Sequence, residues 1–404
     1  MVTRSGGAVA VGSVAAVVLG RVFGIYEVIL LGVAGIVLVL GALVLVARAR
    51  LDLDIARKLQ PPRVHAGSPA RVELRVRNRG ARRTSLLALR DPVGTRGNAR
   101  ILLAPLAPDE EVRAPYALPT GQRGILGVGP LSVEVSDPFG LATVSTGAAP
   151  VVELTVWPAV DEVLPLPHTQ GDDPHGGTDH PNALNTGGED FYALRPYVEG
   201  DDLRRVHWRS TARRDQLMVR QDELPWQGRA TVLLDTRRPA HHHGTFERAV
   251  SACASVVVAT SRRRFLLRLV TTGGLDTGFA AGTAHVEAIL EHLATVDLVE
   301  GPRGRDRRRH VDDLLSVLGG LRRAGSAGAF AAFLGGRSKP DFEAVAGLRP
   351  AYGRVVTVAF ASGRDRNPPP PASDLLLIDD TVRFGPTWDD AIRSRAIPRV
   401  GAGR

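Results

Sequence analysis

Near the N-terminus, residues 28–47 read VILLGVAGIVLVLGALVLVA, which is twenty residues without a charged side chain. An α-helix rises about 1.5 Å per residue, so this run spans the roughly 30 Å hydrocarbon layer of a bilayer. Residues 6–20 are also uncharged, although this run is shorter and richer in glycine and alanine. Together the two runs predict a transmembrane helical hairpin over residues 1–50, with its turn within Arg21–Glu27.

The alternative interpretation of this segment is a secretory signal peptide followed by one membrane helix. A signal peptide begins with a basic region and ends in a cleavage site. Here only Arg4 supplies positive charge before the first run, and the second apolar run follows without an evident cleavage site. The sequence therefore favours the hairpin.

Basic residues predict the orientation of the hairpin, because cytoplasmic flanks carry an excess of lysine and arginine. Arg4 precedes the first helix, and only Arg21 lies in the turn. Four basic residues follow the second helix, namely Arg48, Arg50, Arg57 and Lys58. This asymmetry predicts a protein of the cell membrane with two transmembrane helices, whose soluble domains are cytoplasmic. A secreted binding protein would require the opposite topology.

Composition excludes several classes of protein. The 404 residues are 44% hydrophobic and 23% charged, which excludes a largely disordered chain. A mean hydropathy of -0.01 excludes a multi-span transporter. The single cysteine, Cys253, excludes an intramolecular disulfide and a cysteine-built metal site, and we expect it to be a buried structural thiol. The net charge of +9 reflects a general arginine bias, so we expect no nucleic-acid partner.

From residue 58 to residue 160, apolar and polar residues alternate with the period of a half-buried strand. The run Arg71–Arg77 places Val72, Leu74 and Val76 on one face. Short runs of the same kind, separated by glycine and proline, predict an antiparallel β-sandwich of immunoglobulin-like kind. These runs are residues 85–89, 112–118, 131–135 and 152–156.

Residues 229–400 alternate between strand-like and helix-like segments, which predicts a doubly wound α/β domain. The run from residue 229 to residue 235 is apolar and ends in Asp235. This pattern is typical of a central parallel strand with a functional residue at its carboxyl end. Further strands are predicted at residues 265–271, 327–334, 354–360 and 374–378, and helices at residues 246–262, 286–293 and 311–321.

Residues 161–228 combine a linker with a segment rich in arginine and aromatic residues. Within residues 187–223, seven arginines stand beside eight acidic residues, so the segment is nearly neutral and differs from a phosphate-binding surface. Interleaved arginine, aspartate and aromatic residues predict paired, partly buried guanidinium groups in a structural or partner-binding motif. The linker histidines match no metal-ligand spacing: His168, His175 and His180.

The alternative for this segment is the active site of a hydrolase or transferase, with Asp190, Asp201 and His207 as acid or base. No serine or cysteine stands where such a base would clearly activate it. The chain also has no phosphate-binding glycine loop ending in Lys-Ser or Lys-Thr, no HExxH helix and no GxSxG elbow. We therefore expect no catalytic residue and no small-molecule substrate. In an enzyme, the three side chains would converge within about 3–4 Å of a common point.

The arginine-rich segment carries a dense pattern of residues: Glu189, Asp190, Phe191, Arg195, Tyr197, Gly200, Asp201, Arg204, Trp208, Arg209, Ser210 and Arg213. This pattern resembles the signature of the bacterial family called domain of unknown function 58. The turn at residues 20–24 and the pattern within residues 123–141, which ends in Asp-Pro-Phe-Gly-Leu, extend the resemblance over nearly the whole chain. The resemblance implies a C-terminal domain of von Willebrand factor A type. It also implies a MoxR-type AAA+ ATPase and membrane proteins with a transglutaminase-like domain as partners.

Metal-binding von Willebrand factor A domains begin their site with Asp-x-Ser-x-Ser, whose oxygens help to complete a Mg²⁺ shell. Here the carboxylate is Asp235, but Arg237 and Pro239 stand at the two serine positions. We therefore expect a degenerate metal position without a cofactor, in which Asp235 pairs with an arginine or caps the loop; Mg²⁺ at Asp235 is the alternative. We expect the histidines that follow to be exposed loop residues: His241, His242 and His243.

These inferences predict a membrane-anchored interaction or scaffold protein. The hairpin and the lipid bilayer hold it in place, the β domain acts as a spacer or docking module, and the α/β domain with the arginine-rich motif binds proteins. The resemblance implies that it works with a MoxR-type AAA+ ATPase in the assembly or remodelling of a cell-envelope complex. The hydrolase or transferase remains the alternative.

Overall fold

The computed structural model describes residues 1–48, 52–95, 97–167, 193–197, 206, 208–214, 216–221, 228–241, 243–299, 307–324, 328–336, 338–362 and 375–394. Its contacts divide the chain into two compact units. The first is Met1–Val160 with Leu290–Val296, and the second is Asp161–Ile289 with Asp297–Arg404. Each unit is described by itself.

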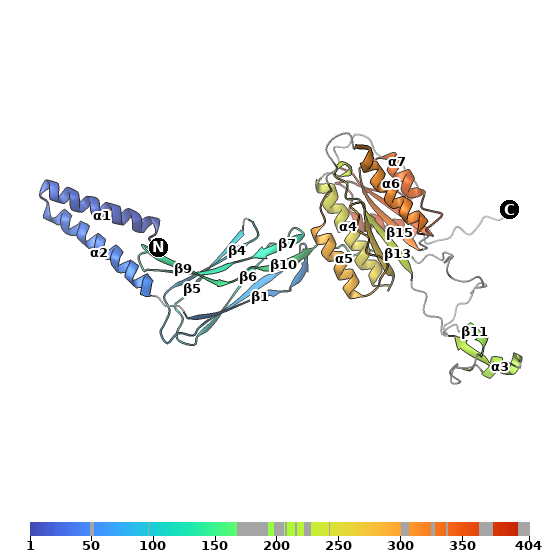
Figure 1. Cartoon of the computed structure of the whole chain (residues 1–404), viewed down its shortest axis with the longest axis horizontal. Helices are drawn as coiled ribbons and strands as arrows, with labels where there is room; N and C mark the ends of the chain where they lie inside the picture. Colours follow the sequence, from blue (N-terminus) through green and yellow to red (C-terminus); the bar gives the residue numbers. More distant parts are fainter. Residues whose placement is uncertain are drawn as a thin grey trace. The chain divides into compact units, whose positions relative to one another are not determined.

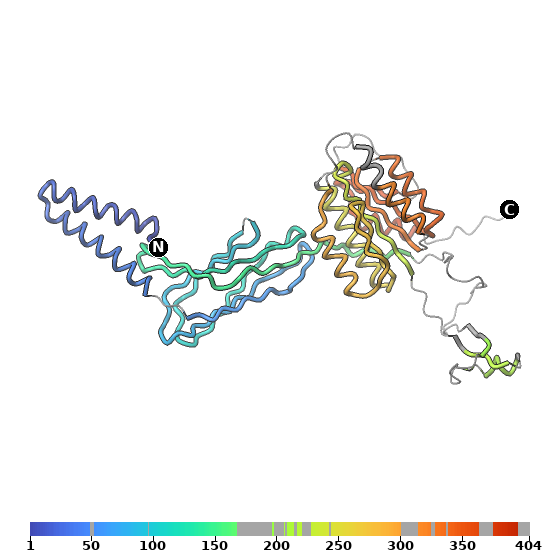
Figure 2. Tube along the Cα trace, in the orientation of Figure 1, coloured from blue at the N-terminus to red at the C-terminus, as the bar shows by residue number. Residues whose placement is uncertain are grey.

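The first unit begins with two antiparallel helices that lie side by side, α1 (Arg4–Phe23) and α2 (Tyr26–Arg48) (Figure 2). Both helices are long and apolar enough to cross a membrane, as the sequence predicts. The chain reverses at Gly24, whose φ of 69° places it in the left-handed region that glycine adopts without strain. The turn therefore lies within the segment expected from the sequence.

Small residues let the two helices approach closely. A Cβ atom on Gly20 would lie 2.8 Å from the Ile29 side chain, and one on Gly32 would lie 2.6 Å from the Ser13 carbonyl oxygen. The backbones therefore pack in direct contact, which is the mode of association that membrane helices favour. The remaining faces expose large apolar side chains, as a lipid-facing surface does, among them Val11, Val18, Leu30, Val37 and Leu45.

The β domain follows as two sheets that share one core. One sheet has the order β1-β3-β6, and the other has the order β2-β10-β7-β4-β8-β9 with β5 paired to β4. Alternate residues of each strand, such as Val72, Leu74 and Val76, point into the core, as the sequence period predicts. The strands are β1 (Leu53–Gln60), β2 (Arg63–His65), β3 (Arg71–Asn78), β4 (Leu87–Val93), β5 (Gly97–Leu103), β6 (Glu111–Ala117), β7 (Gly124–Val128), β8 (Leu131–Ser136), β9 (Thr143–Ala149) and β10 (Val152–Trp157).

This domain begins earlier than the sequence predicts, at Leu53 rather than at residue 58. Arg57 and Lys58, which we counted among the basic residues that flank the membrane, therefore belong to β1. Arg57 is moreover buried in the domain. Its charge is therefore a poor indicator of membrane orientation.

A buried polar cluster joins the two sheets. Arg57 on β1 forms an ion pair with Asp91 on β4, with 2.7 Å between Nη1 and Oδ1, and also donates to the carbonyl oxygen of Pro150. The hydroxyl of Tyr116 on β6 donates to Asp91 Oδ2 at 2.6 Å. Burial, together with the hydrogen bond to Asp91, raises the pKa of Tyr116 well above its ordinary value, so the hydroxyl keeps its proton. Asp91 thus contacts two strands of the opposite sheet, β1 through Arg57 and β6 through Tyr116.

The second unit contains a five-stranded sheet with the order β14-β13-β15-β16-β17, in which all neighbouring strands are parallel. Helix α4 lies on one side of this sheet and α6 and α7 lie on the other (Figure 1). The central strand β15 is buried along its whole length because helices cover both faces. The elements are β13 (Arg229–Leu234), α4 (His243–Ser261), β14 (Leu266–Thr271), the first part of α5 (Thr283–Thr295), α6 (Arg307–Arg323), β15 (Ala329–Gly335), α7 (Lys339–Ala346), β16 (Arg354–Phe360), β17 (Leu375–Ile378) and α8 (Phe384–Ser394); from Leu290 onward α5 is counted with the first unit.

Residues 161–167, which we expected to begin a linker, instead pack on this α/β unit. The amide of Asp161 donates to Ser255 Oγ on α4 at 2.9 Å. The indole Nε1 of Trp388 on α8 donates to the carbonyl oxygen of Leu164 at 2.8 Å. Helices α7 and α8 were not predicted, whereas the predicted strands and helices of this unit are confirmed to within a few residues at each end.

We predict that Asp91→Ala lowers the free energy of unfolding of the β domain by about 3–5 kcal/mol, because it leaves the buried Arg57 guanidinium without a counter-charge. Tyr116→Phe is the matched control and should cost only about 1 kcal/mol, since it leaves the ion pair intact. Denaturant unfolding of the full chain in detergent, followed by circular dichroism, measures both losses. Equal losses would contradict the role given to Asp91.

Candidate functional site

A polar cluster lies at the carboxyl edge of the parallel sheet. Strand β13 is apolar over most of its length, and where it ends the chain leaves the sheet at Asp235, which is fully buried. In open α/β sheets, ligands bind outside the carboxyl ends of the strands. Asp235 therefore lies where the sequence predicts a functional residue.

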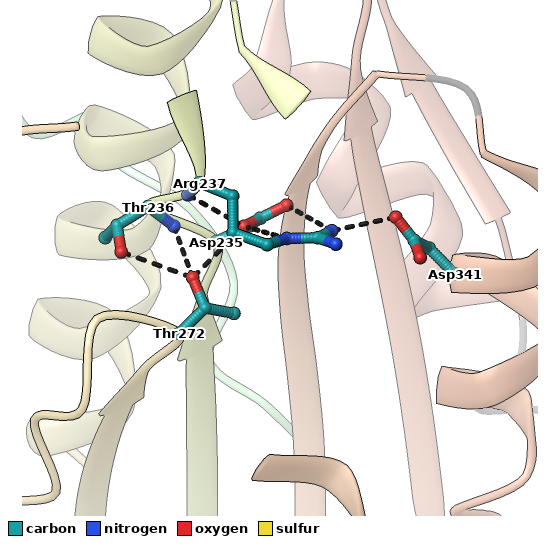
Figure 3. Close-up of polar contacts among 5 residues, drawn as sticks. All are labelled: Asp235, Thr236, Arg237, Thr272 and Asp341. Carbon is teal, nitrogen blue, oxygen red and sulfur yellow. Dashed lines mark hydrogen bonds and ion pairs between the residues drawn. The ribbon is translucent and has the colours of Figure 1, made fainter. Parts of the chain in front are cut away.

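One guanidinium group joins Asp235 to a second carboxylate (Figure 3). Arg237 donates from Nε to Asp235 Oδ1 and from Nη2 to Asp235 Oδ2, each at 2.9 Å, which is a bidentate contact. The same Nη2 donates to Asp341 Oδ2 at 2.8 Å. All three residues are buried, and Asp341 lies in the first turn of α7. The contact therefore joins the loop after β13 to the start of α7, which lies far along the sequence.

Two threonines complete the cluster. Thr272, which follows β14, donates from Oγ1 to Asp235 Oδ1 at 3.1 Å and accepts from the amide of Thr236 at 2.8 Å. The amide of Arg237 also donates to Asp235 Oδ1, at 3.1 Å. Asp235 thus accepts from two guanidinium nitrogens, one backbone amide and one hydroxyl. These four hydrogen bonds fix the conformation of the loop after β13.

The charges of the cluster favour a permanently ionised Arg237. Burial disfavours its charge, but the hydrogen bonds and charges of Asp235 and then of Asp341 outweigh this and raise the pKa of Arg237 above its ordinary value. Asp341 lies in the first turn of a helix, where the helix dipole stabilises a negative charge. The arrangement therefore keeps one internal cation between two carboxylates.

The donor set does not fit a divalent cation while Arg237 is present. Carboxylate and hydroxyl oxygens are ligands that Mg²⁺ accepts, but here the guanidinium already contacts both carboxylates and would repel a second cation. In the part of the chain that the structure describes, no group of three or more histidine, cysteine, aspartate or glutamate residues could hold a metal ion. Asp235 is paired with an arginine, as the sequence suggested.

The arginine-rich motif lies partly on a separate hairpin. Strand β11 (Ala193–Pro196) pairs antiparallel with β12 (Met218–Gln221), and α3 (Trp208–Arg214) precedes β12. Six motif residues are described, one on β11, one directly after it and four on α3: Arg195, Tyr197, Trp208, Arg209, Ser210 and Arg213. Six others lie outside the described residues: Glu189, Asp190, Phe191, Gly200, Asp201 and Arg204. His207 lies outside them too, so the enzymatic alternative rests wholly on residues that the structure does not describe.

Two arginine side chains of α3, those of Arg209 and Arg213, are exposed, whereas the sequence predicts paired, partly buried guanidinium groups in this motif. Trp208 exposes 68% of its surface, and Arg209 and Arg213 are also exposed. Helix α3 has only seven residues and contacts a two-stranded hairpin, so it can cover one face only. The buried residues are instead apolar ones on β12, Met218 and Val219.

Two further sequence candidates have structural roles. His241 is buried rather than exposed, because its ring packs edge-on against Phe246 with 5.3 Å between ring centroids. His243 begins α4, and His242 and the three linker histidines lie outside the described residues. Cys253 is buried in α4, which confirms the expected structural thiol, and burial raises the pKa of that thiol well above its ordinary value.

Comparison with protein families identifies the C-terminal region. Residues 193–381 match the family described as "Protein of unknown function DUF58". This region belongs to the DUF58 family. The match runs from β11 to just beyond β17, so the DUF58 region contains both α3 and the cluster of Asp235, Arg237 and Asp341. No curated protein matches the chain.

Several solved structures resemble part of the chain. The CARDB domain of a Pyrococcus furiosus protein is 18% identical with a TM-score of 0.21, and the match covers 28% of this chain and 97% of that domain. The putative ApaA protein from Bordetella pertussis is 16% identical with a TM-score of 0.19, over 26% of this chain and 94% of that one. A β-glucosidase from Listeria innocua is 14% identical with a TM-score of 0.18, over 26% of this chain and 16% of the enzyme. Scores this low carry no argument about fold or function.

Sequence analysis found Asp235 but missed two other members of the cluster. Arg237 was noted only as a residue that excludes a cation, and Thr272 and Asp341 were not singled out. The usable signal was position, since Thr272 follows one neighbour of β13 and Asp341 follows the other neighbour, β15. Polar residues that follow adjacent parallel strands meet at one edge of the sheet.

We predict that Arg237→Gln lowers the free energy of unfolding of the α/β unit by about 3–5 kcal/mol, because two buried carboxylates lose their cation. Arg262→Gln, at an exposed position directly after α4, is the matched control and should change stability by less than about 0.5 kcal/mol.

Urea unfolding of the unsubstituted protein and of the two variants at neutral pH measures both losses. Equal losses for the two variants would contradict the role given to Arg237.

Proposed function

We propose that this DUF58 protein is a membrane-anchored interaction or scaffold component that binds other proteins and transforms no substrate. The proposed partners are a MoxR-type AAA+ ATPase and membrane proteins with a transglutaminase-like domain, in the assembly or remodelling of a cell-envelope complex. The resemblance of the motif supplies this class of partner. The observation that carries the proposal is the exposure of Trp208 on α3.

An exposed tryptophan beside two exposed arginines is typical of a protein-binding surface, because tryptophan and arginine are enriched among the residues that dominate interface energies. Arg209 and Arg213 are four residues apart on α3, so they lie on one helical face. Their guanidinium groups suit carboxylates of a partner. The hairpin holds this helix through the amide of Met218, which donates to Thr211 Oγ1 at 3.0 Å.

The cluster at the sheet edge supports a role without catalysis. The position where α/β sheets bind ligands is occupied by an arginine that is already paired with two carboxylates. The proposal therefore includes a von Willebrand factor A type of domain with a degenerate metal position at Asp235. This type of domain is supported by Asp235, which follows β13, an interior strand of the parallel sheet.

We further propose that the helices span the cell membrane with both soluble units on the cytoplasmic side. Arg4 and Arg48 lie at the same end of the antiparallel hairpin, and Arg21 lies near the other end. The excess of positive charge at the end that leads into the β domain supports this orientation. Because Arg57 is buried in β1, the charge difference is smaller than the sequence suggests.

We predict that Trp208→Ala reduces recovery of the ATPase partner from native membrane extracts by about tenfold or more, in the presence of ATP and a cross-linker. The unsubstituted full chain is the bait. Trp208→Phe should retain part of the binding, since it keeps an aromatic ring. Ile125→Ala on β7, which removes an apolar side chain of similar exposure elsewhere, should leave recovery unchanged.

Two outcomes would overturn the proposal. Undiminished recovery by folded Trp208→Ala would exclude α3 as the binding surface. Failure of the unsubstituted protein to recover any ATPase would exclude that class of partner.

The orientation has its own test. With both soluble units in the cytoplasm, a fluorescent protein fused after Arg404 should fluoresce, and alkaline phosphatase fused at the same point should be inactive. Active phosphatase together with a dark fluorescent protein would place the DUF58 region outside the cytoplasm.

A further inference from the structure

The turn between β8 and β9 carries an exposed aromatic ring. Its residues read Asp-Pro-Phe-Gly, and Phe139 exposes 66% of its surface. A phenylalanine in such a turn would ordinarily pack inward, because burying its ring is favourable. The neighbours of this turn indicate what covers the ring.

Asp137 holds the turn in shape and leaves the ring outside it. Its buried carboxylate accepts from the amide of Phe139 at 2.9 Å and from the amide of Ala142 at 2.6 Å. The amide of Gly140 donates to the carbonyl oxygen of Asp137 at 3.0 Å. The backbone around Phe139 is therefore fixed by polar contacts in which the ring takes no part.

The same turn contacts both apolar helices. The hydroxyl of Thr3, which caps α1, donates to the carbonyl oxygen of Gly140 at 2.6 Å, and the amide of Thr3 donates to that of Leu141 at 2.9 Å. Leu141 and Ala142 form one hydrophobic cluster with residues of α2, namely Val39, Ala42 and Val46. The turn thus lies at the end of the hairpin where α1 begins and α2 ends.

This end of the hairpin has the composition of a membrane–water boundary. Arg4 begins α1 and Arg48 ends α2, and both are exposed. Arginines at the ends of membrane helices extend their charged groups to the headgroups, and the apolar faces of interfacial segments, which often carry phenylalanine, insert at the boundary between headgroups and acyl chains. Val2, which is also exposed, forms a β-bridge with Ala142, so an exposed apolar residue lies beside the strand that follows the turn.

We infer that Phe139 inserts into the headgroup region of the phospholipid bilayer on the side of Arg4 and Arg48, so that the turn is a third membrane contact beside the two helices. The inference rests on the proposed membrane anchor. The occupant is lipid because the turn that carries the ring bonds to the residue that caps α1 and shares a hydrophobic cluster with α2, the two helices of the proposed anchor. The contact orients the β domain against the membrane surface, since Asp137 and Thr3 fix the turn to the hairpin.

Single-cysteine labelling of the full chain in vesicles of phosphatidylcholine and phosphatidylglycerol tests this inference. Cys253 is buried and its thiol has a raised pKa, so it takes no label in the folded protein at neutral pH. An environment-sensitive fluorophore is attached to Phe139→Cys. Two further variants calibrate it, Val37→Cys in the middle of α2 and Ile125→Cys on β7, where the native side chain is 55% exposed.

We expect lipids with a nitroxide near the headgroup to quench the Phe139→Cys label more strongly than the Ile125→Cys label, on the order of threefold or more. Lipids with a nitroxide deep in the acyl chain should quench the Val37→Cys label best. Iodide in the aqueous phase should show the reverse order between the Phe139→Cys and Ile125→Cys labels.

Three outcomes would overturn the inference. If the Phe139→Cys label behaves like the Ile125→Cys label while the Val37→Cys label is quenched by lipid, the anchor stands and the third contact is wrong. If the Phe139→Cys label is shielded from both lipid and iodide, a protein surface covers the turn instead. If the Val37→Cys label is not quenched by lipid, the proposed membrane anchor itself is wrong, and the inference falls with it.

Discussion

The guanidinium of Arg237 lies between two buried carboxylates, Asp235 two residues before it and Asp341 104 residues after it. Removing an ion from water costs several kcal/mol, so none of these three charges could be buried alone. The loop after β13 and the first turn of α7 must therefore come together for the sheet edge to close. The paired charges also take up carboxylate oxygens that a ligand at this edge would need.

The sequence predicts those elements whose signal is local. Twenty uncharged residues suffice to predict α2, and the alternation around Val72 and Leu74 suffices to predict β3. Strand β1 was missed because Arg57 interrupts its apolar face, and β9 because its residues are small and polar. The ion pair that lets Arg57 lie inside a sandwich joins residues 34 positions apart, and local periodicity carries no trace of such a partner.

The candidate site shows the same limit. Asp235 could be found, because an acidic residue directly after an apolar strand indicates a functional position at the carboxyl edge of a parallel sheet. Its pairing with an arginine could also be expected, whereas the role of Asp341 depends on the topology that brings the first turn of α7 to the loop after β13. The exposure of Trp208 could not be predicted, since an aromatic residue among arginines and aspartates has the same sequence pattern whether it faces a core or a partner.

The buried cluster of Arg57, Asp91 and Tyr116 has a mechanical consequence. Strand β1 begins five residues after the end of α2, so a pull on the helical hairpin reaches the β domain through β1 as well as through the turn before β9. That strand lies at the edge of its sheet and pairs with β3 over eight residues, while Arg57 joins it to Asp91 in the opposite sheet. Detaching β1 would therefore require shearing the whole ladder and separating a buried ion pair in the same event.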